Sequence, residues 1–581
     1  MSALAVAVVA VALLLSAQGA VPQAPGPTHA AEPFLQEQPV VVLSDRLVCS
    51  LLGEQGEAAG IRGMDNGGVT AVNGVVYWTF GDTVLADDSV LPNSVGWSES
   101  TDASRCLDLT PKEGSSGATA LMAQVPGSEM TVWPMGLVSA TEDRIHFYYA
   151  SVVSDPDVRW RVTGVGIGSF DTETLVAERA LGGALLWKEG MPKPSRAFTD
   201  GRYVYTLLDI SRAPWTKDTI LARVPKESIE SPASYEYWDA GEADSPGRWL
   251  GDLWDEETGS WDSAVAELPA LWRQRGMHNG VEVVYNDYLE RWLAVYSTGF
   301  MSSVNVRSAV DLTGPWDGPE AVLVGCATFH PPVQEGFLCY SGAQHEFYTQ
   351  DDGRTIYISY SNSGTYQPYL HEIRLAAAIT QWSDEQGHAI YLAGDVAGPA
   401  GFTKDGPAFY ASDIRVPGLT PIHRWEHLET DGIRYGAAPP EPAGAYRYAG
   451  VAFYAPVDAA AAKATNALYA PVFLWQRADT VRYSPLNLAP LGFTQQEVAF
   501  YAACPDVDSD TLTDCEESFL GTDALLADTD GDRLPDGYEL TTLGCHPLLY
   551  NDDRDGVPSA VELVIGTNPC LREAYARTDA N

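Results

Sequence analysis

Residues 64–83 read MDNGGVTAVNGVVYWTFGDT, and the pattern of this stretch decides which class of fold the sequence predicts. Asn73-Gly74 lies between two apolar runs, which is the strongest short-range signal for a two-residue type I′ β-hairpin. Pairing outward from the turn puts Val72 opposite Val75, Val69 opposite Trp78, and Gly67 opposite Phe80. The stretch therefore predicts two long antiparallel strands in fixed register.

The same register places two carboxylates across from each other. If the ladder runs without a bulge, Asp65 faces Asp82 with Cα atoms about 4.5–5.5 Å apart. Such closeness raises the proton affinity of one carboxyl group, which supplies an acid beside a base, as glycosidic bond cleavage requires. The alternative is that both are ordinary strand-end residues. Gly67, Gly68 and Gly81 are expected to let a substrate approach the backbone closely.

Similar strand-like runs continue from about residue 40 to residue 375. They are rich in Val, Ile, Tyr, Phe and Trp, and read VVYWTFGD, RIHFYYASV, RYVYTLLDI, RWLAVYSTG and TIYISYSNS. Turn residues separate them and no helical period is sustained. The sequence thus predicts an all-β chain whose residues 40–375 form a five-bladed β-propeller catalytic domain, with ligands over its central channel.

A second repeat follows the predicted propeller. GPAFYA (406–411), GVAFYA (450–455) and EVAFYA (497–502) are each preceded by a tryptophan, in ITQW (379–382), IHRW (422–425) and VFLW (472–475). One such unit cannot bury its aromatic face alone, so residues 376–503 are predicted to form a threefold, trefoil-like β module. The repeat resembles secreted modules with a Gly-Val-Ala-Phe-Tyr signature that accompany bacterial hydrolases. Its aromatic residues are interpreted mainly as core, and glycan binding by the module stays open.

The third repeat is acidic and occupies residues 504–581. DVDSDTLTDCEE (506–517), DTDGDRLPDGYE (528–539) and NDDRDGVPSAVE (551–562) each place side-chain oxygens at positions 1, 3, 5, 9 and 12. This is the ligand spacing of a calcium loop. The candidate ligands are Asp506, Asp508, Asp510, Asp514, Glu517, Asp528, Asp530, Asp532, Asp536, Glu539, Asn551, Asp553, Asp555, Ser559 and Glu562.

These loops resemble thrombospondin type 3 and related bacterial calcium repeats, including the Gly-Thr-Asp at 521–523 and the Gly-Thr-Asn at 566–568. Calcium is then expected to supply much of the folding energy of the array, which would serve as a stiff spacer or a surface attachment. The alternative is a solvated acidic tail. No organic cofactor is predicted.

Charge and the N-terminal segment indicate where the protein works. A formal net charge of −43 argues against nucleic acid and anionic membranes as partners. Residues 1–20 have the apolar run and small-residue end of a signal peptide, and 21–39 form a Pro/Ala-rich linker. An uncleaved anchor remains the alternative, because the positive n-region is missing. The eight cysteines are interpreted as disulfides of a secreted chain, with pairings that the sequence does not fix.

Several ordered motifs resemble one family. Met-Asp-Asn-Gly at 64–67 with Trp-Thr-Phe-Gly-Asp-Thr at 78–83 is similar to the opening blade of bacterial five-bladed propellers, long a domain of unknown function, that include endo-D-arabinanases. Further matches are TVWPMGLV (131–138), NGVEVVYNDYLERWLAVYS (279–297), LTGPWDGP (312–319), and TIYISYSNSG with YLHEIRL (355–375). The resemblance implies hydrolysis of D-arabinofuranosyl linkages, as in mycobacterial arabinogalactan and lipoarabinomannan, with Asp65 and Asp82 as the catalytic acids. CATFHPPVQEGFLC (326–339) and the Trp- and acid-rich segment 231–276 depart from the pattern and could reshape the cleft.

Four further residues are weaker candidates for substrate binding. Trp133 is a possible stacking platform, and His278 and His345 could bind sugar hydroxyls, although each also fits a structural role. Glu282 is either a third site carboxylate or outward-facing, since a buried charge is costly unless paired. The function predicted is a secreted glycoside hydrolase. The alternatives are a non-catalytic, calcium-stiffened glycan-binding adhesin and a propeller glycosidase acting on another furanoside.

Overall fold

The computed structural model describes most of the chain after residue 33. The described residues are 34–35, 39–141, 143–157, 159–213, 216–241, 247–275, 280–298, 303–316, 321–325, 339–394, 396–442, 444–465, 468–508, 510–551 and 562–563. The predicted signal peptide, His278 and most of the 326–339 stretch lie outside them. None of the helices in the described part is both long and apolar enough to cross a membrane.

Between residues 42 and 375 the described chain forms five antiparallel sheets of four or more strands, here called blades 1 to 5. Blade 1 contains β2 (Ile61–Val72), β3 (Val75–Leu85), β4 (Val90–Leu91), β5 (Ser94–Ser98) and β6 (Thr110–Pro111). Blade 2 contains β9 (Thr131–Ser139), β10 (Arg144–Asp155), β11 (Arg159–Asp171), β12 (Ala177–Arg179) and β13 (Trp187–Lys188). Blade 3 contains β14 (Lys193–Thr199), β15 (Tyr203–Ala213), β16 (Thr216–Pro225), β17 (Glu236–Asp239), β18 (Arg248–Leu250) and β21 (Trp272–Arg275).

The last two blades complete the set. Blade 4 contains β22 (Glu282–Asn286), β23 (Arg291–Thr298), β24 (Ser303–Ala309) and β25 (Ala321–Gly325). Blade 5 contains β26 (Cys339–Gln344), β27 (Thr355–Asn362), β28 (Gln367–Leu375) and the N-terminal β1 (Val42–Ser50). Short pairs β7 (Glu113–Gly114) with β8 (Gly117–Ala118), and β19 (Trp254–Asp255) with β20 (Ser260–Trp261), lie outside these sheets. Helix α1 (Gly53–Ala58) and 3₁₀ helices at Ala180–Gly183, Lys226–Ser228, Pro232–Ser234, Ser263–Glu267, Glu346–Tyr348 and Asp351–Gly353 fill the connections.

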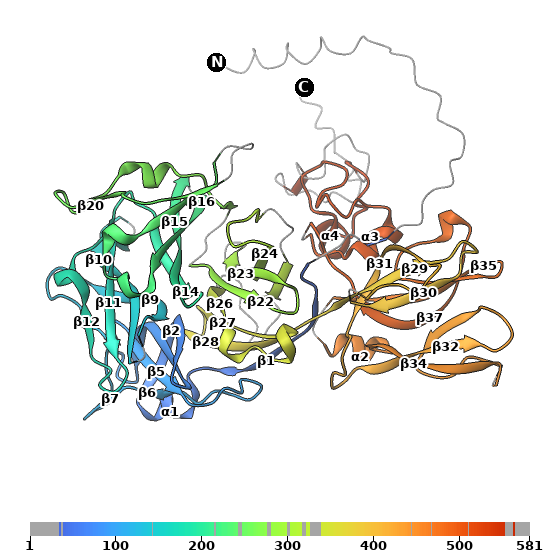
Figure 1. The fold of residues 1–581 in the computed structure, drawn as a ribbon, viewed down its shortest axis with the longest axis horizontal. Coiled ribbons are helices and arrows are strands. Elements are labelled where there is room, and N and C mark those ends of the chain that lie inside the picture. Colours follow the sequence, from blue (N-terminus) through green and yellow to red (C-terminus); the bar gives the residue numbers. More distant parts are fainter. Residues whose placement is uncertain are drawn as a thin grey trace, which may run out of the picture.

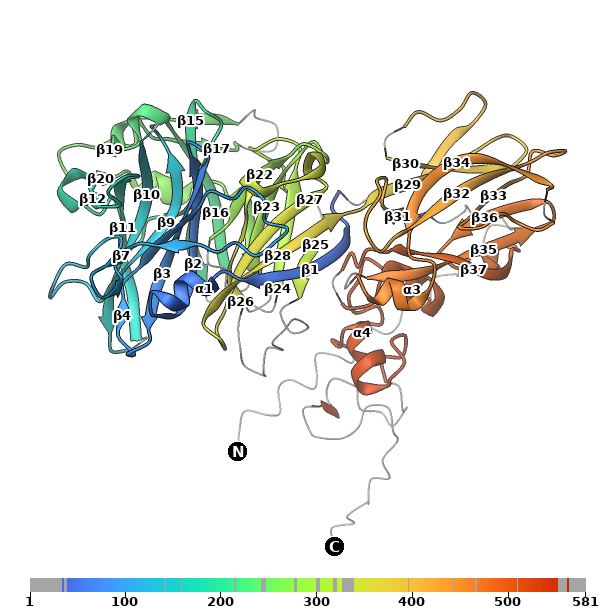
Figure 2. The same cartoon turned by 90° about the horizontal axis from the view of Figure 1, so that it is seen from below.

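The blades close into a ring. Each innermost strand contacts the innermost strand of the next blade, in the order β2, β9, β14, β22, β26 and back to β2. Strand β1 pairs with β28, so the chain before blade 1 completes blade 5. This is the arrangement of a β-propeller closed by its N-terminal strand, and it confirms the all-β prediction. Figures 1 and 2 show the blades, coloured blue to yellow, as one body beside a second, orange body.

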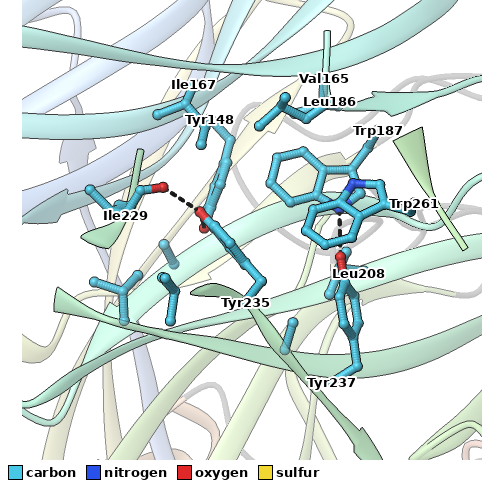
Figure 3. Close-up of a cluster of buried hydrophobic side chains, with 14 of the residues drawn as sticks. Tyr148, Val165, Ile167, Leu186, Trp187, Leu208, Ile229, Tyr235, Tyr237 and Trp261 are labelled. Carbon is cyan, nitrogen blue, oxygen red and sulfur yellow. Dashed lines mark hydrogen bonds between the residues drawn. The ribbon is translucent and has the colours of Figure 1, made fainter. Parts of the chain in front are cut away.

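An aromatic core joins blades 2 and 3 (Figure 3). The Tyr235 hydroxyl donates to the Ile229 carbonyl at 2.8 Å and lies 3.1 Å from the Tyr148 hydroxyl, while Trp187 Nε1 donates to the Tyr237 hydroxyl at 3.0 Å. The buried polar atoms of these rings are thereby satisfied. Trp261 stacks on Trp187 with centroids 5.6 Å apart. Part of the Trp-rich segment 231–276 therefore packs in a core.

The orange body contains three similar units of three strands in the described residues. They are β29 (Ala377–Ser383), β30 (Ala389–Ala393) and β31 (Thr403–Ala411); β32 (Thr420–His427), β33 (Ile433–Gly436) and β34 (Tyr446–Ala455); and β35 (Tyr469–Arg477), β36 (Thr480–Ser484) and β37 (Thr494–Ala503). In each unit the first strand pairs with the other two. Units 1, 2 and 3 then meet cyclically, through β30 with β34, β33 with β37, and β36 with β31. Helix α2 (Ala459–Lys463) and a 3₁₀ helix at Ala489–Leu491 connect strands.

Three tyrosines mark the pseudo-threefold axis of this module. The backbone N–H of Tyr391 donates to the Tyr435 hydroxyl at 3.0 Å, that of Tyr435 to Tyr483 at 3.0 Å, and that of Tyr483 back to Tyr391 at 2.8 Å. Beneath them the phenylalanines of the three Ala-Phe-Tyr motifs pack mutually with centroids 5.3–5.4 Å apart. The repeated motifs thus build a shared core, as their spacing predicted.

The acidic segment follows with helices α3 (Asp514–Leu520), α4 (Asp536–Tyr538) and a π-helix at Glu539–Leu543. Helices α3 and α4 begin at position 9 of the first and second predicted calcium loops. The Gly537 N–H donates to Asp510 Oδ2 at 2.8 Å, which links the second loop to the first. Disulfides join Cys49 to Cys106 and Cys504 to Cys515, and Cys339 and Cys545 are also disulfide-bonded.

Candidate active site

The register of the opening hairpin follows the prediction near the turn and then departs from it. Val72 pairs with Val75 and Val69 with Trp78, but Phe80 pairs with Asn66 instead of Gly67, and the register shifts on both sides of Asn66. A Cβ added to Gly67 would lie 2.1 Å from the Thr79 carbonyl oxygen. The ladder therefore contains a bulge, and the prediction that Asp65 pairs directly with Asp82 is wrong. The two strands approach so closely at Gly67 that only a glycine fits there.

Asp65, near the start of β2, is held by two tyrosines from blade 5. Tyr340 on β26 donates its hydroxyl to Asp65 Oδ1, and Tyr366, in the turn between β27 and β28, donates to Oδ2 at 3.0 Å. Burial raises the pKa of Asp65 to about 6, the tyrosine hydrogen bonds oppose that shift, and the charge of Asp82 adds to it. Asp65 is thus a carboxyl group that holds its proton into the range of near-neutral pH.

Asp82, on β3, is held by the inner strand of blade 2. Thr131 Oγ1 and Trp133 Nε1 both donate to Asp82 Oδ1, at 2.5 Å and 3.1 Å. Burial raises the pKa of this carboxyl group too, and both donors lower it. The donors fix one oxygen of Asp82.

The two carboxyl groups lie near each other despite the bulge. A Cβ built on Gly81 would lie 3.1 Å from Asp65 Cβ and 3.5 Å from Trp133 Cδ1, so Asp65 sits over Gly81 beside the ring that binds Asp82. Burial first, and then the negative charges of both aspartates, raise the pKa of Tyr366. The arrangement brings together two carboxyl groups whose pKa values are both raised by burial. Gly81 leaves room for this pair, whereas Gly67 and Gly68 serve close strand packing and not substrate approach.

Trp133 lies beside the aspartate pair and is half-buried, and its role as a stacking platform stays a prediction. Its indole nitrogen orients Asp82, and its ring meets the ring of Trp160 edge-on with centroids 4.9 Å apart. Trp160 lies near the tip of the β10–β11 hairpin and is 44% exposed. Trp160 is therefore an exposed indole that packs on the ring bound to Asp82, and no sequence motif predicts it.

Glu282 faces the central channel, which excludes the outward-facing alternative. Its Oε2 lies 3.6 Å from Arg196 Nε, and Arg196 also donates to the Gly67 carbonyl oxygen inside the bulge. Burial raises the pKa of Glu282 to about 7, against the lowering effect of Arg196 and with a further raising effect from Glu346. Arg196 and Glu282 support the backbone beside Asp65. In the part of the chain that the structure describes, they do not contact Asp65 itself.

His345 is buried and has a structural environment. It is 2% exposed, its ring packs on Trp78 at 4.4 Å, and its Nε2 lies 2.7 Å from Ser359 Oγ. Burial and the charge of Arg196 lower its pKa to about 3, so it is neutral. With Glu282 it lines a channel cavity of about 90 Å³. The expectation that His345 binds a sugar directly is not supported by this placement, and His278 lies outside the described residues.

The acidic loops bring together oxygen atoms that fit a divalent cation. Ligand atoms of Asp506, Asp508 and Asp510 lie within 4.8 Å of one another, as do those of Asp528, Asp530 and Asp532. The position-12 residues Glu517 and Glu539 are fully buried, and both carboxylate oxygens of each lack a hydrogen-bond partner among the described residues. Burial first, and then neighbouring carboxylates, raise the pKa of each to about 8. Buried carboxylates of this kind need a compensating charge, and oxygen-only ligands suit calcium.

The position-9 residues accept hydrogen bonds from within their own loops, as the aspartates at positions 1, 3 and 5 also do. Asp514 Oδ1 accepts the Val507 N–H at 3.1 Å, and Asp536 accepts the N–H and the hydroxyl of Thr529 at 2.9 and 2.6 Å. They shape the loops, as position 9 often does when it reaches calcium through water. In the third loop Asn551 and Glu562 are described, while Asp553, Asp555 and Ser559 lie outside the described residues.

Three residues that contact the aspartates, Thr131, Tyr340 and Tyr366, lie outside the opening hairpin. Thr131 lies within the TVWPMGLV motif and Tyr366 follows TIYISYSNSG, so the motif matches had marked their neighbourhoods. Tyr340 had no such signal. It directly follows Cys339, and only the closure of the ring brings it to Asp65.

Comparison with known families identifies the family of the propeller. The family profile described as "Domain of unknown function (DUF4185)" matches residues 53–393, which include blades 1 to 4, most of blade 5 and both aspartates. The chain belongs to the DUF4185 family. No curated protein matches it.

Several solved structures are similar to this DUF4185 chain, at low sequence identity. A protein of unknown function from Dyadobacter fermentans is 11% identical, with 58% of this chain and 99% of that chain covered and a TM-score of 0.33. A family 43 β-xylosidase/α-arabinofuranosidase from a compost microbial metagenome is 12% identical, with coverage of 62% and 98% and a TM-score of 0.34. A family 117 glycoside hydrolase from Zobellia galactanivorans is 10% identical, with coverage of 58% and 92% and a TM-score of 0.34.

Proposed function

We propose that this DUF4185 protein is a secreted glycoside hydrolase that cleaves D-arabinofuranosyl linkages, as in arabinogalactan or lipoarabinomannan. The observation that carries the proposal is the pair of neighbouring carboxyl groups, Asp65 with a pKa of about 6 and Asp82 with one oxygen held by two donors. Paired carboxyl groups with different environments are what glycoside hydrolysis uses. The choice of sugar rests on the sequence motifs quoted above.

In this reaction Asp65 is the proton donor. Its carboxyl proton passes to the glycosidic oxygen as the bond from that oxygen to the anomeric carbon breaks. A water molecule supplies the oxygen that bonds to the anomeric carbon. In a direct displacement Asp82 takes up the proton of that water. In a two-step route Asp82 first bonds to the anomeric carbon, the deprotonated Asp65 then takes up the water proton, and Asp82 leaves as a carboxylate. Tyr340 and Tyr366 hold Asp65 in place, and Trp133 and Thr131 do the same for Asp82.

The proposal is tested by product analysis on mycobacterial arabinogalactan. Wild type is expected to release oligosaccharides, and Asp65→Asn and Asp82→Asn each to lower kcat by about 10²–10⁴-fold, the usual contribution of a general acid or base. Asp87→Asn, an exposed change in the same blade, is the matched control and should act as wild type. Absence of products from wild type, or full activity in both variants, refutes the proposal. Retained glycan binding in that case favours the adhesin alternative.

We further propose that the C-terminal loops bind calcium as a structural ion. Glu517 and Glu539, fully buried with no hydrogen-bond partner for their oxygens in the described chain, support this assignment. The aspartates at positions 1, 3 and 5 of the first two loops complete the oxygen set. The ion offsets a repulsion that would otherwise oppose compaction of the loops.

Calcium removal provides the measurement. Adding EDTA to the full chain is expected to lower the midpoint of a low-temperature unfolding transition, and excess calcium to restore it. Glu539→Gln should weaken that response, while Glu429→Gln, an exposed change in the module, should not. An EDTA-insensitive melt, or equal responses of the two variants, would remove the calcium assignment.

A further inference from the structure

Asp65 is followed in the chain by a buried asparagine that the proposed mechanism does not use. Asn66 lies on β2 and is 5% exposed. Its backbone N–H donates to Ser361 Oγ at 2.6 Å, and its Nδ2 donates to the Ser341 carbonyl oxygen and to Ser359 Oγ, both at 2.8 Å. All three partners belong to blade 5. Asn66 therefore binds the strand that carries Asp65 to the neighbouring blade.

Two of these partners are neighbours of Tyr340, which donates its hydroxyl to Asp65 Oδ1. Ser341 follows Tyr340 on β26, and Ser361 pairs with Tyr340 across the β26–β27 ladder. The bond from Asn66 to Ser341 thus joins the residue after Asp65 to the residue after Tyr340. The distance between the Asp65 carboxyl group and the Tyr340 hydroxyl therefore depends on this contact.

The backbone of β26 is irregular at the same place. The register of β26 against β27 shifts between Tyr340 and Ala343, and Ser341 has a left-handed φ of 56°. A bulge of this kind interrupts the ladder, so the ladder alone does not fix the direction of Tyr340. The Asn66 amide binds the carbonyl oxygen within that bulge. A side chain of blade 1 thus holds the irregular part of blade 5.

The orientation of the Asn66 amide is set by its partners. The Ser341 carbonyl oxygen can only accept a hydrogen bond, so Nδ2 and not Oδ1 faces it. Ser359 Oγ accepts from Nδ2 and lies 2.7 Å from His345 Nε2. Burial lowers the pKa of His345 to about 3, so its neutral ring can accept the hydroxyl proton of Ser359. The buried His345 therefore orients Ser359, which in turn holds Asn66.

The residue before Asp65 is bound to the same blade. The Met64 N–H donates to the Tyr366 carbonyl oxygen at 2.8 Å, and the Tyr366 hydroxyl donates to Asp65 Oδ2 at 3.0 Å. The chain is therefore attached to blade 5 on both sides of Asp65. A carboxyl group between two such attachments is kept next to its hydrogen-bond donors.

Asn66 also carries a cost that stability alone does not explain. Its Oδ1 is buried and has no hydrogen-bond partner among the described residues. A buried acceptor without a partner destabilises the folded chain. An apolar side chain of similar size would avoid that cost but could not bind the Ser341 carbonyl oxygen. The presence of an amide here favours a role in the site.

We propose that Asn66 is a positioning residue, which holds the Asp65 carboxyl group against Tyr340 and Tyr366 in the geometry for proton donation to a glycosidic oxygen. Its contribution to catalysis rests on the hydrolase function proposed above, whereas its hold on Asp65 does not. The tyrosine hydroxyls stabilise the ionised form of Asp65, so a variant that separates them from it raises the pKa of Asp65.

The test is an infrared titration of Asp65 in the full chain, which needs no substrate. The difference between each protein and the same protein with Asp65→Asn isolates the carbonyl band of the protonated Asp65 carboxyl group. Its midpoint, about 6 in the wild type, is expected to rise by about one pH unit in Asn66→Ala, the effect of weakening one hydrogen bond to a charged group. Ser359→Ala, which keeps the Ser341 contact, should give a smaller shift in the same direction.

The matched control is Asn286→Ala. Asn286 of blade 4 is 1% exposed, and its Nδ2 donates at 2.8 Å to the carbonyl oxygen of Gly353, which lies between β26 and β27 of blade 5. It therefore joins two blades in the same manner, and its loss should leave the Asp65 midpoint in place. On arabinogalactan, Asn66→Ala is expected to lower kcat about 10- to 100-fold with KM within about twofold, and Asn286→Ala to change neither.

The outcomes separate the two proposals. A midpoint that stays in place in Asn66→Ala, or that moves equally in Asn286→Ala, overturns the positioning role even if wild type hydrolyses the polymer. A shift specific to Asn66→Ala supports the hold on Asp65 even if no products form, and then only the hydrolase proposal fails. If Asn66→Ala does not fold, Ser359→Ala decides, and an unchanged midpoint in that variant overturns the role.

Discussion

At the scale of single residues, Asp65 keeps a raised proton affinity although two tyrosines donate hydrogen bonds to it. Burial raises its pKa to about 6 and outweighs the two donors, which favour the ionised form. The pKa of Asp82 is also raised, and among the described residues its hydrogen-bond donors contact one carboxylate oxygen only. In the proposed mechanism, this difference in surroundings, and not in residue type, makes Asp65 the acid and Asp82 the base.

Trp160 gives the first prediction at this scale. Its ring is 44% exposed and packs on Trp133, which holds Asp82. Trp160→Ala is expected to raise KM about tenfold, or ~1.4 kcal/mol of binding, with kcat within about twofold. Trp160→Phe should keep most of the affinity. Steady-state kinetics on soluble oligosaccharides provide the measurement, and a large fall in kcat with unchanged KM would contradict a platform role.

The two aspartates could be predicted from sequence, but their partners could not. Asp65 and Asp82 lie on one local hairpin that an Asn-Gly turn specifies. Tyr340 and Tyr366 lie 275 and 301 residues from Asp65 along the chain. These long-range contacts form only when the ring of blades closes, and no local sequence pattern predicts that closure.

At the scale of elements, the bulge in β2 positions the site. The register counted from the turn is kept as far as Val69, and then β2 meets the next blade, where a Cβ on Gly68 would lie 2.8 Å from Leu137 Cδ1. Arg196 of blade 3 binds the Gly67 carbonyl oxygen in the same place. The strand bends in response to neighbouring blades, so hairpin rules alone could not predict the shift. The aromatic repeats of the module, in contrast, could be recognised in the sequence, because each copy places a residue at the same position in the core.

Gly67→Ala tests the bulge. The added methyl group would lie 2.1 Å from the Thr79 carbonyl oxygen, so the strands must separate. The expected result is a loss of about 3 kcal/mol or more in unfolding free energy, with activity reduced in whatever protein remains folded. Gly251→Ala, where the nearest atom lies at 3.9 Å, is the matched control and should cost little. Denaturant unfolding of both variants gives the comparison, and equal stabilities would argue against a tight bulge.

At the scale of the whole molecule, the propeller depends on joining its first and last blades. Strand β1 completes blade 5, and Cys49 on β1 is bonded to Cys106, in the segment between β5 and β6 of blade 1. The bond therefore ties the closing strand to the neighbouring blade. It also holds Tyr340 and Tyr366 of blade 5 near Asp65 of blade 1.

Removing this disulfide tests the closure. The bond spans 57 residues, so the Cys49→Ser/Cys106→Ser double variant is expected to lose about 4 kcal/mol of unfolding free energy. The Cys504→Ser/Cys515→Ser variant, which opens an 11-residue span in the array, should leave the main propeller transition unchanged. Calorimetry of the full chain distinguishes the two, and an unchanged propeller transition in the first variant would contradict the role given to β1.

The pH dependence of kcat/KM tests the central claim most directly, because it reports the pKa values of the free enzyme. With Asp65 as the proton donor, activity of the wild type should fall as pH rises through about 6. Tyr366→Phe removes a donor that stabilises the carboxylate, so it should raise the pKa of Asp65 and move this falling limb to higher pH. A limb that stays in place in Tyr366→Phe, or wild-type activity that persists undiminished above pH 8, would contradict the account.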